Sequence, residues 1–429
     1  MNLFDRVKIE NRRLSFGWRD AAIAVGWLFY WNTNRRRIKP RFELSDQRRD
    51  GMVESFTGIT EGSIDAGNRV EILQNGSYFD RMLGDIHSAQ SSIHIETFVW
   101  WSGEICDRIA EALAARAREG VEVRLMVDYS GSWRMDRNLR KMMRKAGCEV
   151  HRFHAPTPAN IGRLNNRTHR KINVFDGRIA YVGGHGIAQE WTGSGQDKNH
   201  FRDTCARVEG PVVNTLQGVF CENWIEETGR VPISARYFPK LEKMGKTDAH
   251  VAFASPRGSM SAVQLLYYLA IPFVQKELLI QNPYFLPHAD AIDELQRAAK
   301  RGVDVRIMLP AAPVNNKPMV QHASHHHYGD LLESGVRIFE YQQTLIHQKI
   351  IVVDQQWSCV GSTNFDDRSF QLNDEVTVGF TDPEIAGKLR ESFFADRRLA
   401  EEVRLDAWRR RPRRHKILDD LAFSTRREL

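Results

Sequence analysis

The sequence predicts an α/β protein made of two tandem lobes, each a mixed sheet flanked by helices. Strand-like and helix-like segments alternate along most of the 429 residues, an order typical of α/β layers. The segment GVEVRLM at 120–126 returns as GVDVRIM at 302–308. A longer segment at 168–184 returns at 346–362. An internal repeat of this kind indicates two copies of one folding unit, related by a pseudo-two-fold axis.

The predicted elements follow the same order in both halves. Apolar runs favour strands, and amphipathic Ala-rich patterns that end just before a glycine favour helices. Short connections favour locally parallel strands joined by right-handed crossovers. In chain order these elements are strands at 92–100 and 277–285, helices at 109–119 and 292–301, the repeated GV segments, helix–strand units at 139–154 and 331–341, and the strand pairs at 168–184 and 346–362.

Composition bounds the protein class. Apolar residues make up 42% and charged residues 27%, which excludes a disordered or multi-span membrane protein. A net charge of +7 and an isoelectric point near 9.1 favour anionic partners, either a membrane surface or nucleic acid. The five scattered cysteines favour a reducing compartment. We divide the chain into a basic N-terminal extension (1–67), lobe one (68–230), a linker (231–248), lobe two (249–396) and a basic tail (397–429).

The N-terminal extension contains one uncharged, mostly apolar run at 21–31, AAIAVGWLFYW. Eleven residues are too few to span a bilayer, and no cleavage pattern follows. Two interpretations have equal weight. The run packs on the main body, or it lies in a membrane interface with its aromatic rings at headgroup level.

The chemistry lies in the longer repeat, where each copy contains the motif H-x-K-x4-D. The motif residues are His169, Lys171, Asp176, His347, Lys349 and Asp354. A histidine and a lysine two apart on a strand point to the same face. A two-fold axis would bring both pairs into one cleft, where ammonium groups neutralise a phosphodiester without a metal or cofactor. One imidazole then attacks phosphorus while the other protonates the leaving alcohol.

The aspartates of the motif sit at turns. Asp176 precedes a glycine in a hairpin-turn signal, and Asp354 stands at the matching turn. We group both with the catalytic motif but interpret them mainly as structural, binding backbone or a basic partner.

The doubled motif and its surroundings resemble the phospholipase D superfamily, and its bacterial cardiolipin synthase branch in particular. The similarity covers about 68–396 and includes IET at 95–97, NPYFLP at 282–287, GSTN at 361–364 and FDDRSFQLNDE at 365–375. The resemblance implies a phosphohistidine intermediate, with His169 as nucleophile and His347 as acid and later base. These two roles could be reversed, because both copies of the motif are intact.

The resemblance also implies roles for residues after each motif. Lys171, Lys349, Ser362 and Asn364 would hold phosphoryl oxygens, with the glycine turn Gly183-Gly184 in the matching place of the first copy. Asp203 and Glu375, one downstream of each motif, would orient the histidines. The first copy has Gly186 where the second has Asn364, so the two half-sites are unequal.

The implied activity is transfer of a phosphatidyl group between two phosphatidylglycerol molecules, giving cardiolipin and glycerol. We expect phospholipid substrates, possibly including phosphatidylethanolamine, and a peripheral enzyme on an anionic membrane surface, at the cytoplasmic face of a bacterial inner membrane. The alternatives are a phospholipid hydrolase and, less favoured, a nucleic-acid phosphodiesterase. Nucleic acid is a less favoured partner because the aromatic residues are not interleaved with lysine and arginine.

Two further features are open. The histidines of 322–327 fit a zinc site, a helix lining the cleft, or a solvated face; the sequence supplies no nearby acidic ligand, so we predict no metal. The basic run WRRRPRRHK at 408–416 fits anionic headgroups, nucleic acid, or a solvated charge run.

Overall fold

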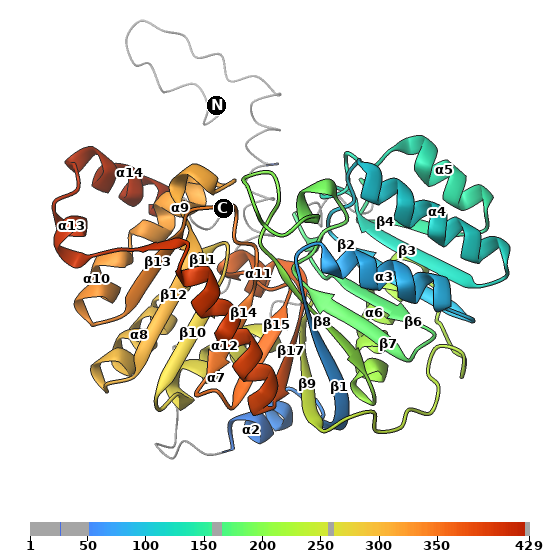
Figure 1. Ribbon diagram of the computed structural model, residues 1–429, viewed down its shortest axis with the longest axis horizontal. Helices are drawn as coiled ribbons and strands as arrows, with labels where there is room; N and C mark the ends of the chain where they lie inside the picture. The colour runs from blue at the N-terminus through green and yellow to red at the C-terminus, as the bar shows by residue number, and fades with distance from the viewer. Residues whose placement is uncertain (1–25, 27–50, 157–164, 256–260, 425–429) are drawn as a thin grey trace, which may run out of the picture.

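The computed structural model describes residue 26 and residues 51–156, 165–255 and 261–424 (Figure 1). The apolar run at 21–31 lies outside these ranges except for residue 26, so both interpretations of it stay predictions. Across the described ranges, every helix is too short or too polar to cross a bilayer.

One mixed sheet of sixteen strands runs through both lobes. β1 (Asp65–Gln74) and β9 (Thr247–Ala254) pair antiparallel at its centre. Outward from that pair, the first lobe reads β1-β8-β7-β6-β2-β3-β4 and the second β9-β17-β15-β14-β10-β12-β13-β18. The two orders correspond strand for strand until β18, and Figure 1 shows the lobes on either side of the central pair. The predicted fold class is confirmed.

The remaining strands of the first lobe are β2 (Ser92–Thr97), β3 (Glu122–Asp128), β4 (Glu149–Phe153), β6 (Ile172–Phe175), β7 (Ile179–Gly183) and β8 (Thr204–Glu209). Its helices are α3 (Ser77–Ser88), α4 (Glu104–Arg118), α5 (Arg137–Lys145) and α6 (Val212–Thr228), preceded in the chain by α2 (Met52–Ile59).

The remaining strands of the second lobe are β10 (Glu277–Gln281), β12 (Asp304–Pro310), β13 (Arg337–Tyr341), β14 (Ile350–Val353), β15 (Trp357–Gly361), β17 (Asn373–Thr381) and β18 (Ala400–Glu402), with β11 (Phe285–Leu286) and β16 (Phe365–Asp366) forming a separate pair. Its helices are α7 (Ala262–Phe273), α8 (Ala289–Lys300), α9 (Pro318–His325), α10 (Tyr328–Glu333), α11 (Asp367–Gln371), α12 (Pro383–Arg397), α13 (Leu405–Arg409) and α14 (Arg413–Ser424).

The predicted repeat elements form as expected. The apolar runs become β2 and β10, and the Ala-rich patterns become α4 and α8. β2 and β3 pair in parallel, as do β10 and β12, as a right-handed crossover requires. The longer repeat forms the antiparallel hairpins β6–β7 and β14–β15.

The lobes share a core as well as a sheet. Each lobe has its own apolar cluster, and a third cluster draws on both lobes. α6 contacts β9 of the second lobe, and α12 contacts β1 of the first. A buried ion pair between Arg202 and Asp396, at 2.8 Å, joins the lobes near the site. The interface is therefore packed like a protein interior, and groups placed across it are held rigidly.

The chain after α12 folds back on the second lobe. β18 pairs antiparallel with β13 at the edge of the sheet. The last described helix, α14, packs against α9 (Figure 1). Trp408 of α13 contacts the rings of Tyr328 and His325.

Candidate active site

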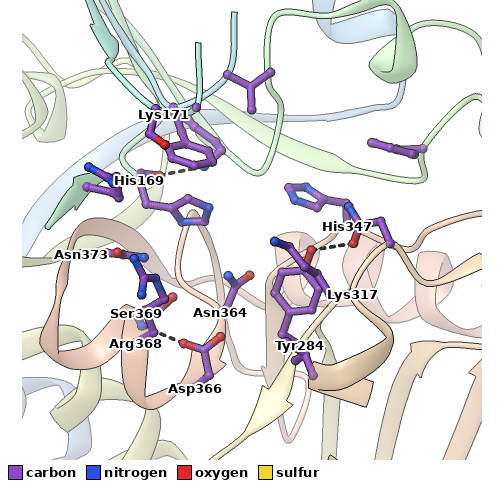
Figure 2. A pocket seen from close by; sticks show the side chains of 18 of the residues that line it. His169, Lys171, Tyr284, Lys317, His347, Asn364, Asp366, Arg368, Ser369 and Asn373 are labelled. Atoms are coloured by element: carbon purple, nitrogen blue, oxygen red, sulfur yellow. Dashed lines mark hydrogen bonds between the residues drawn. The ribbon is translucent and has the colours of Figure 1, made fainter. Parts of the chain in front are cut away.

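His169 and His347 come from different lobes and face one another across one cavity (Figure 2). Each lies just before a central strand, β6 or β14. The strand β5 (Arg167–Thr168) crosses into the second lobe and pairs with β17, and the His169 N–H donates to the Asp374 C=O over 2.9 Å. In the matching place, the His347 N–H donates to the Arg202 C=O over 2.7 Å. Backbone pairing between the lobes therefore fixes both histidines.

Each imidazole is held by a carboxylate of the opposite lobe. Glu375 of β17 accepts from Nδ1 of His169 at 2.9 Å, and Asp203, just before β8, accepts from Nδ1 of His347 at 2.7 Å. Asp203 follows the His169 motif in the chain and Glu375 follows the His347 motif, so the pairing in space is crossed. Because Nδ1 donates to the carboxylate, Nε2 is the ring atom left to act on a ligand.

Each carboxylate is in turn held by a different donor. Ser362 Oγ donates to Glu375 over 2.5 Å, whereas the indole N–H of Trp191 donates to Asp203 over 2.8 Å. Gly184 stands where the second lobe has Ser362, and a Cβ at Gly184 would lie 2.3 Å from an Asp203 oxygen. Trp191 thus takes the place of the serine. The structure directs Ser362 and Gly184 at the carboxylates and not at the cavity.

Two more predicted residues differ in their placement. Asn364 lines the cavity, whereas Gly183 does not and packs where a Cβ would lie 2.6 Å from the Thr204 carbonyl oxygen. A Cβ at Gly186 would lie 3.0 Å from two ring carbons of Trp191. The indole therefore fills the first-lobe position that corresponds to Asn364, which explains why the half-sites differ.

Both lysines of the motif are buried beside the histidines. Lys171 lines the cavity and its Nζ donates to the His169 C=O over 2.8 Å. The Nζ of Lys349 lies 3.0 Å and 3.1 Å from the two ring nitrogens of His347. Burial lowers the pKa of Lys171 to about 8 and that of Lys349 to about 7. A bound anion would favour both ammonium forms, so this pair suits an anionic ligand.

The histidines are neutral when no anion is bound. Burial lowers the pKa of His169 to about 4 and that of His347 to about 3, and Lys349 adds to the effect at His347. Burial alone would raise the pKa of Asp203 and Glu375, but the facing histidines and lysines hold both below their usual range. Two neutral imidazoles beside two carboxylates form a site that can attack an electrophile and take up a proton.

The cavity between the histidines has a volume of about 510 Å³ and two unlike walls. Figure 2 shows the polar wall beside His169 and the pair Tyr284 and Lys317 on the His347 side. Phe98 lies 5.0 Å from the His169 ring and Trp191 lies 5.3 Å from the His347 ring, centroid to centroid. The polar wall contains Arg167, Asn364, Asp366, Arg368, Ser369 and Asn373, and the apolar lining contains Phe98, Val99, Trp101, Trp133, Trp191 and Phe201.

Basic groups outnumber acidic groups in this lining. Arg167, Lys171, Lys317 and Arg368 face one carboxyl group, Asp366, whose pKa burial raises to about 6. A cationic cavity with one aromatic side suits a ligand that joins a phosphodiester to an apolar body.

The structure does not bring Asp176 and Asp354 to the cavity. Asp176 accepts hydrogen bonds from the backbone N–H groups of residues 90–92 at 2.7–2.9 Å. Asp354 accepts from those of residues 275–277 over the same distances. Both lie in hairpin turns at the far ends of β6 and β14 from the histidines. Their role is to tie the turn to the start of the neighbouring strand, as the mainly structural interpretation states.

The histidine cluster lies on and just after α9, against α14. His322 donates to Asp419 over 2.8 Å, and His325 Nδ1 lies 3.5 Å from the same oxygen. By spacing, these three residues could hold a metal ion. However, Arg411 donates to the other oxygen of Asp419 at 2.8 Å, so this carboxylate already has a cationic partner. The cluster joins α9, which carries Val320 of the cavity lining, to α14.

A duplicated lobe with two facing histidines, two lysines and no side-chain nucleophile other than imidazole at its centre defines the phospholipase D class of phosphoryl-transfer proteins. The model of the family described as "Cardiolipin synthase, PLD-like domain" matches residues 82–220 and 271–397. The chain belongs to this family, and with it to the phosphatidyltransferases of the phospholipase D superfamily.

Named relatives agree with this assignment. Cardiolipin synthase 1 of Staphylococcus epidermidis is 34% identical over 360 residues, covering 83% of this chain and 73% of that protein. Cardiolipin synthase of Staphylococcus aureus is 34% identical over 356 residues, covering 82% and 72%. Among solved structures, phosphatidylserine synthase of Haemophilus influenzae matches with a TM-score of 0.64 at 14% identity, covering 86% of this chain and 97% of that chain. The last match supports the fold alone.

Proposed function

We propose that this protein makes cardiolipin by moving a phosphatidyl group from one phosphatidylglycerol molecule to a hydroxyl group of another. The observation that carries the proposal is the pair of facing imidazoles, each held by the carboxylate of the other lobe, in a chain related throughout both lobes to cardiolipin synthases. The phospholipid substrate follows from the family, and the particular donor and acceptor are the proposed part.

In the first step, His169 Nε2 attacks the phosphorus of the donor. A P–N bond forms, the P–O bond to glycerol breaks, and His347 gives its Nε2 proton to the departing glycerol oxygen. This needs a protonated His347, although its pKa is about 3 in the unliganded site. The bound phosphodiester supplies the negative charge that favours this proton, and Asp203 stabilises the resulting imidazolium.

In the second step, the acceptor hydroxyl replaces glycerol. His347, now neutral, removes the proton of that hydroxyl, whose oxygen attacks phosphorus while the P–N bond breaks. Lys171 and Lys349 neutralise the non-bridging oxygens in both steps, and Asn364 donates from the cavity wall. Glu375 stabilises the positive charge on His169 while it is bonded to phosphorus. The apolar lining of the cavity limits access of water, which would turn transfer into hydrolysis.

The membrane location belongs to the same proposal. We place the protein at an anionic membrane surface, at the cytoplasmic face of a bacterial inner membrane, because its substrates are membrane lipids and its net charge is +7.

The deciding experiment is mass spectrometry of the lipids after the full chain meets phosphatidylglycerol vesicles, alone and mixed with phosphatidylethanolamine. Cardiolipin together with free glycerol supports the proposal, and the mixed incubation identifies the donor. Phosphatidic acid as the only product would mean a hydrolase. No lipid product, together with cleavage of an oligonucleotide, would favour a nucleic-acid phosphodiesterase.

The same assay tests the roles of the histidines. A phosphodiester with a nitrophenyl leaving group departs without protonation, so His347→Ala should still release one nitrophenol per site, whereas His169→Ala should release none. The opposite result would exchange the two roles.

A further inference from the structure

A second basic depression, outside the catalytic cavity, lies between α5 and the end of β4 in the first lobe. Its volume is about 210 Å³, and it is lined by Tyr129, Ser132, Trp133, Met135, Arg137, Arg140 and Arg152. Three arginines thus line a hollow that contains neither motif histidine and neither motif lysine. Trp133 also lines the catalytic cavity, so the two hollows share one side chain.

The three arginines lack acidic partners. Among the described residues, no carboxylate lies within 4.0 Å of the charged groups of Arg137, Arg140 or Arg152, although most arginines of the sheet edges and helices have one. Burial lowers the pKa of Arg140, and its neighbours Arg152, Arg144 and Arg137 lower it further. Like charges gathered without a counter-charge are unfavourable unless an anion binds among them.

The depression is also built from fixed parts. The guanidinium group of Arg152 stacks on the Tyr129 ring at 4.1 Å and donates to the Tyr129 C=O at 3.2 Å. The loop that carries Trp133 is held by Asp128, which accepts from the backbone N–H groups of Ser130 and Gly131 at 2.8 Å and 2.7 Å. The site therefore needs little ordering to bind a ligand, which favours affinity.

One feature of the rim selects the ligand class. Trp133 is 69% exposed, although it is held in a rigid loop between two basic hollows. An exposed indole beside arginines is the arrangement that membrane proteins use at the headgroup level of a bilayer. An arginine fork matches the geometry of a phosphate group.

We infer that Arg137, Arg140 and Arg152 form a binding site for the phosphate of an anionic phospholipid, separate from the scissile phosphodiester, with Trp133 inserted in the membrane interface beside it. The site would hold the protein on the bilayer with the mouth of the catalytic cavity against the lipids. Only the choice of a lipid as the source of the phosphate rests on the proposed function.

The test compares two double variants with the same loss of charge on the same helix. Arg137→Gln with Arg140→Gln removes two lining arginines, and Lys141→Gln with Lys145→Gln removes two exposed lysines outside the depression. Binding of the full chain is measured by sedimentation with phosphatidylcholine vesicles, with and without phosphatidic acid. Phosphatidic acid is a phosphomonoester, so it is not a substrate for phosphodiester transfer and binding is read without turnover.

Both variants lose the same long-range attraction to the membrane. We expect the arginine variant to bind the acidic vesicles at least about tenfold more weakly than the lysine variant, the loss expected for hydrogen bonds to a charged group. Equal binding by the two variants would overturn the site. A failure of cardiolipin synthesis would appear in the lipid products and leave this binding result unaffected.

Inorganic phosphate distinguishes the sources of the ligand. Competition by inorganic phosphate for vesicle binding of the wild type, and not of the arginine variant, supports a site that recognises the phosphate group of the lipid. Binding of inorganic phosphate through these arginines with no difference in vesicle binding would replace the lipid by free phosphate. Arginine-dependent binding of a short oligonucleotide without any vesicle effect would overturn the lipid assignment in favour of nucleic acid.

Discussion

Replacing Glu375 by glutamine should disable the histidine of the other lobe. The substitution keeps the shape of the side chain and removes its charge, which lies 2.9 Å from Nδ1 of His169. At that distance, with an effective dielectric constant near 20, the attraction to a positively charged imidazole is about 6 kcal/mol. If most of it acts in the transition state, Glu375→Gln slows transfer by roughly a thousand- to ten-thousandfold.

The assay separates the crossed pairing from pairing in chain order. With the nitrophenyl phosphodiester, which needs no acid, Glu375→Gln should lose the nitrophenol burst as His169→Ala does. Asp203→Asn should keep the burst and lose transfer to the lipid acceptor, as His347→Ala does. The matched control is Asp374→Asn. This neighbouring carboxyl group is equally buried, but burial raises its pKa to about 7, so the substitution removes little charge.

One result would refute the reasoning. If Glu375→Gln behaves like His347→Ala, each carboxylate serves the histidine of its own motif and the crossed geometry does not operate. A loss in Asp374→Asn equal to that in Glu375→Gln would mean that β17 is disturbed as a whole and that the effect is not electrostatic.

Three further predictions concern stability and pH. Asp176→Asn should lower the free energy of unfolding by about 1–3 kcal/mol, because a charged acceptor of three backbone N–H groups is lost, and should leave kcat unchanged in the folded protein; a fall in kcat without a change in the urea midpoint would contradict this. Binding of a non-reactive phosphodiester should take up roughly one proton near pH 7, because the anion raises the pKa of His169 or His347 from about 4 and about 3; calorimetry in two buffers of different ionisation enthalpy would show no uptake if the histidines were already charged. Burial lowers the pKa of His325, but its hydrogen bonds with Asp419 and Glu340 raise it overall, so the docking of α14 is fully stabilised below pH about 6.5 and weakens as pH rises; limited proteolysis should release α14 faster at higher pH, and His325→Gln should remove this pH dependence.

Much of the fold was accessible from the sequence because the repeat is local. Strand and helix patterns occur twice in the same order, and each copy depends on side-chain periodicity within a few residues. The catalytic histidines and lysines were found for the same reason, since their two-residue spacing on a strand fixes the face they share. The turn positions of Asp176 and Asp354 likewise indicated the backbone contacts that the structure contains.

The rest of the site depends on contacts between distant segments. The crossing of Asp203 and Glu375 arises where β5 pairs with β17, and no pattern within one lobe reports it. Trp191 has no counterpart in the second repeat, and the signal that pointed to it was negative: Gly184 and Gly186 where the other copy has Ser362 and Asn364. His322 gained its acidic partner, Asp419, from 97 residues further along the chain.

The crossed pairing has a consequence for the newly made chain. A ribosome completes the first lobe while the second is still being synthesised, and at that stage His169 lacks the carboxylate that sets its tautomer and offsets its charge. His347 meets Asp203 only after both hairpins have docked. Neither half alone is therefore an active catalyst, so a fragment or a stalled nascent chain would not attack the phosphodiester bonds of the surrounding membrane. Activity begins only when the last strand of the central pairing is in place.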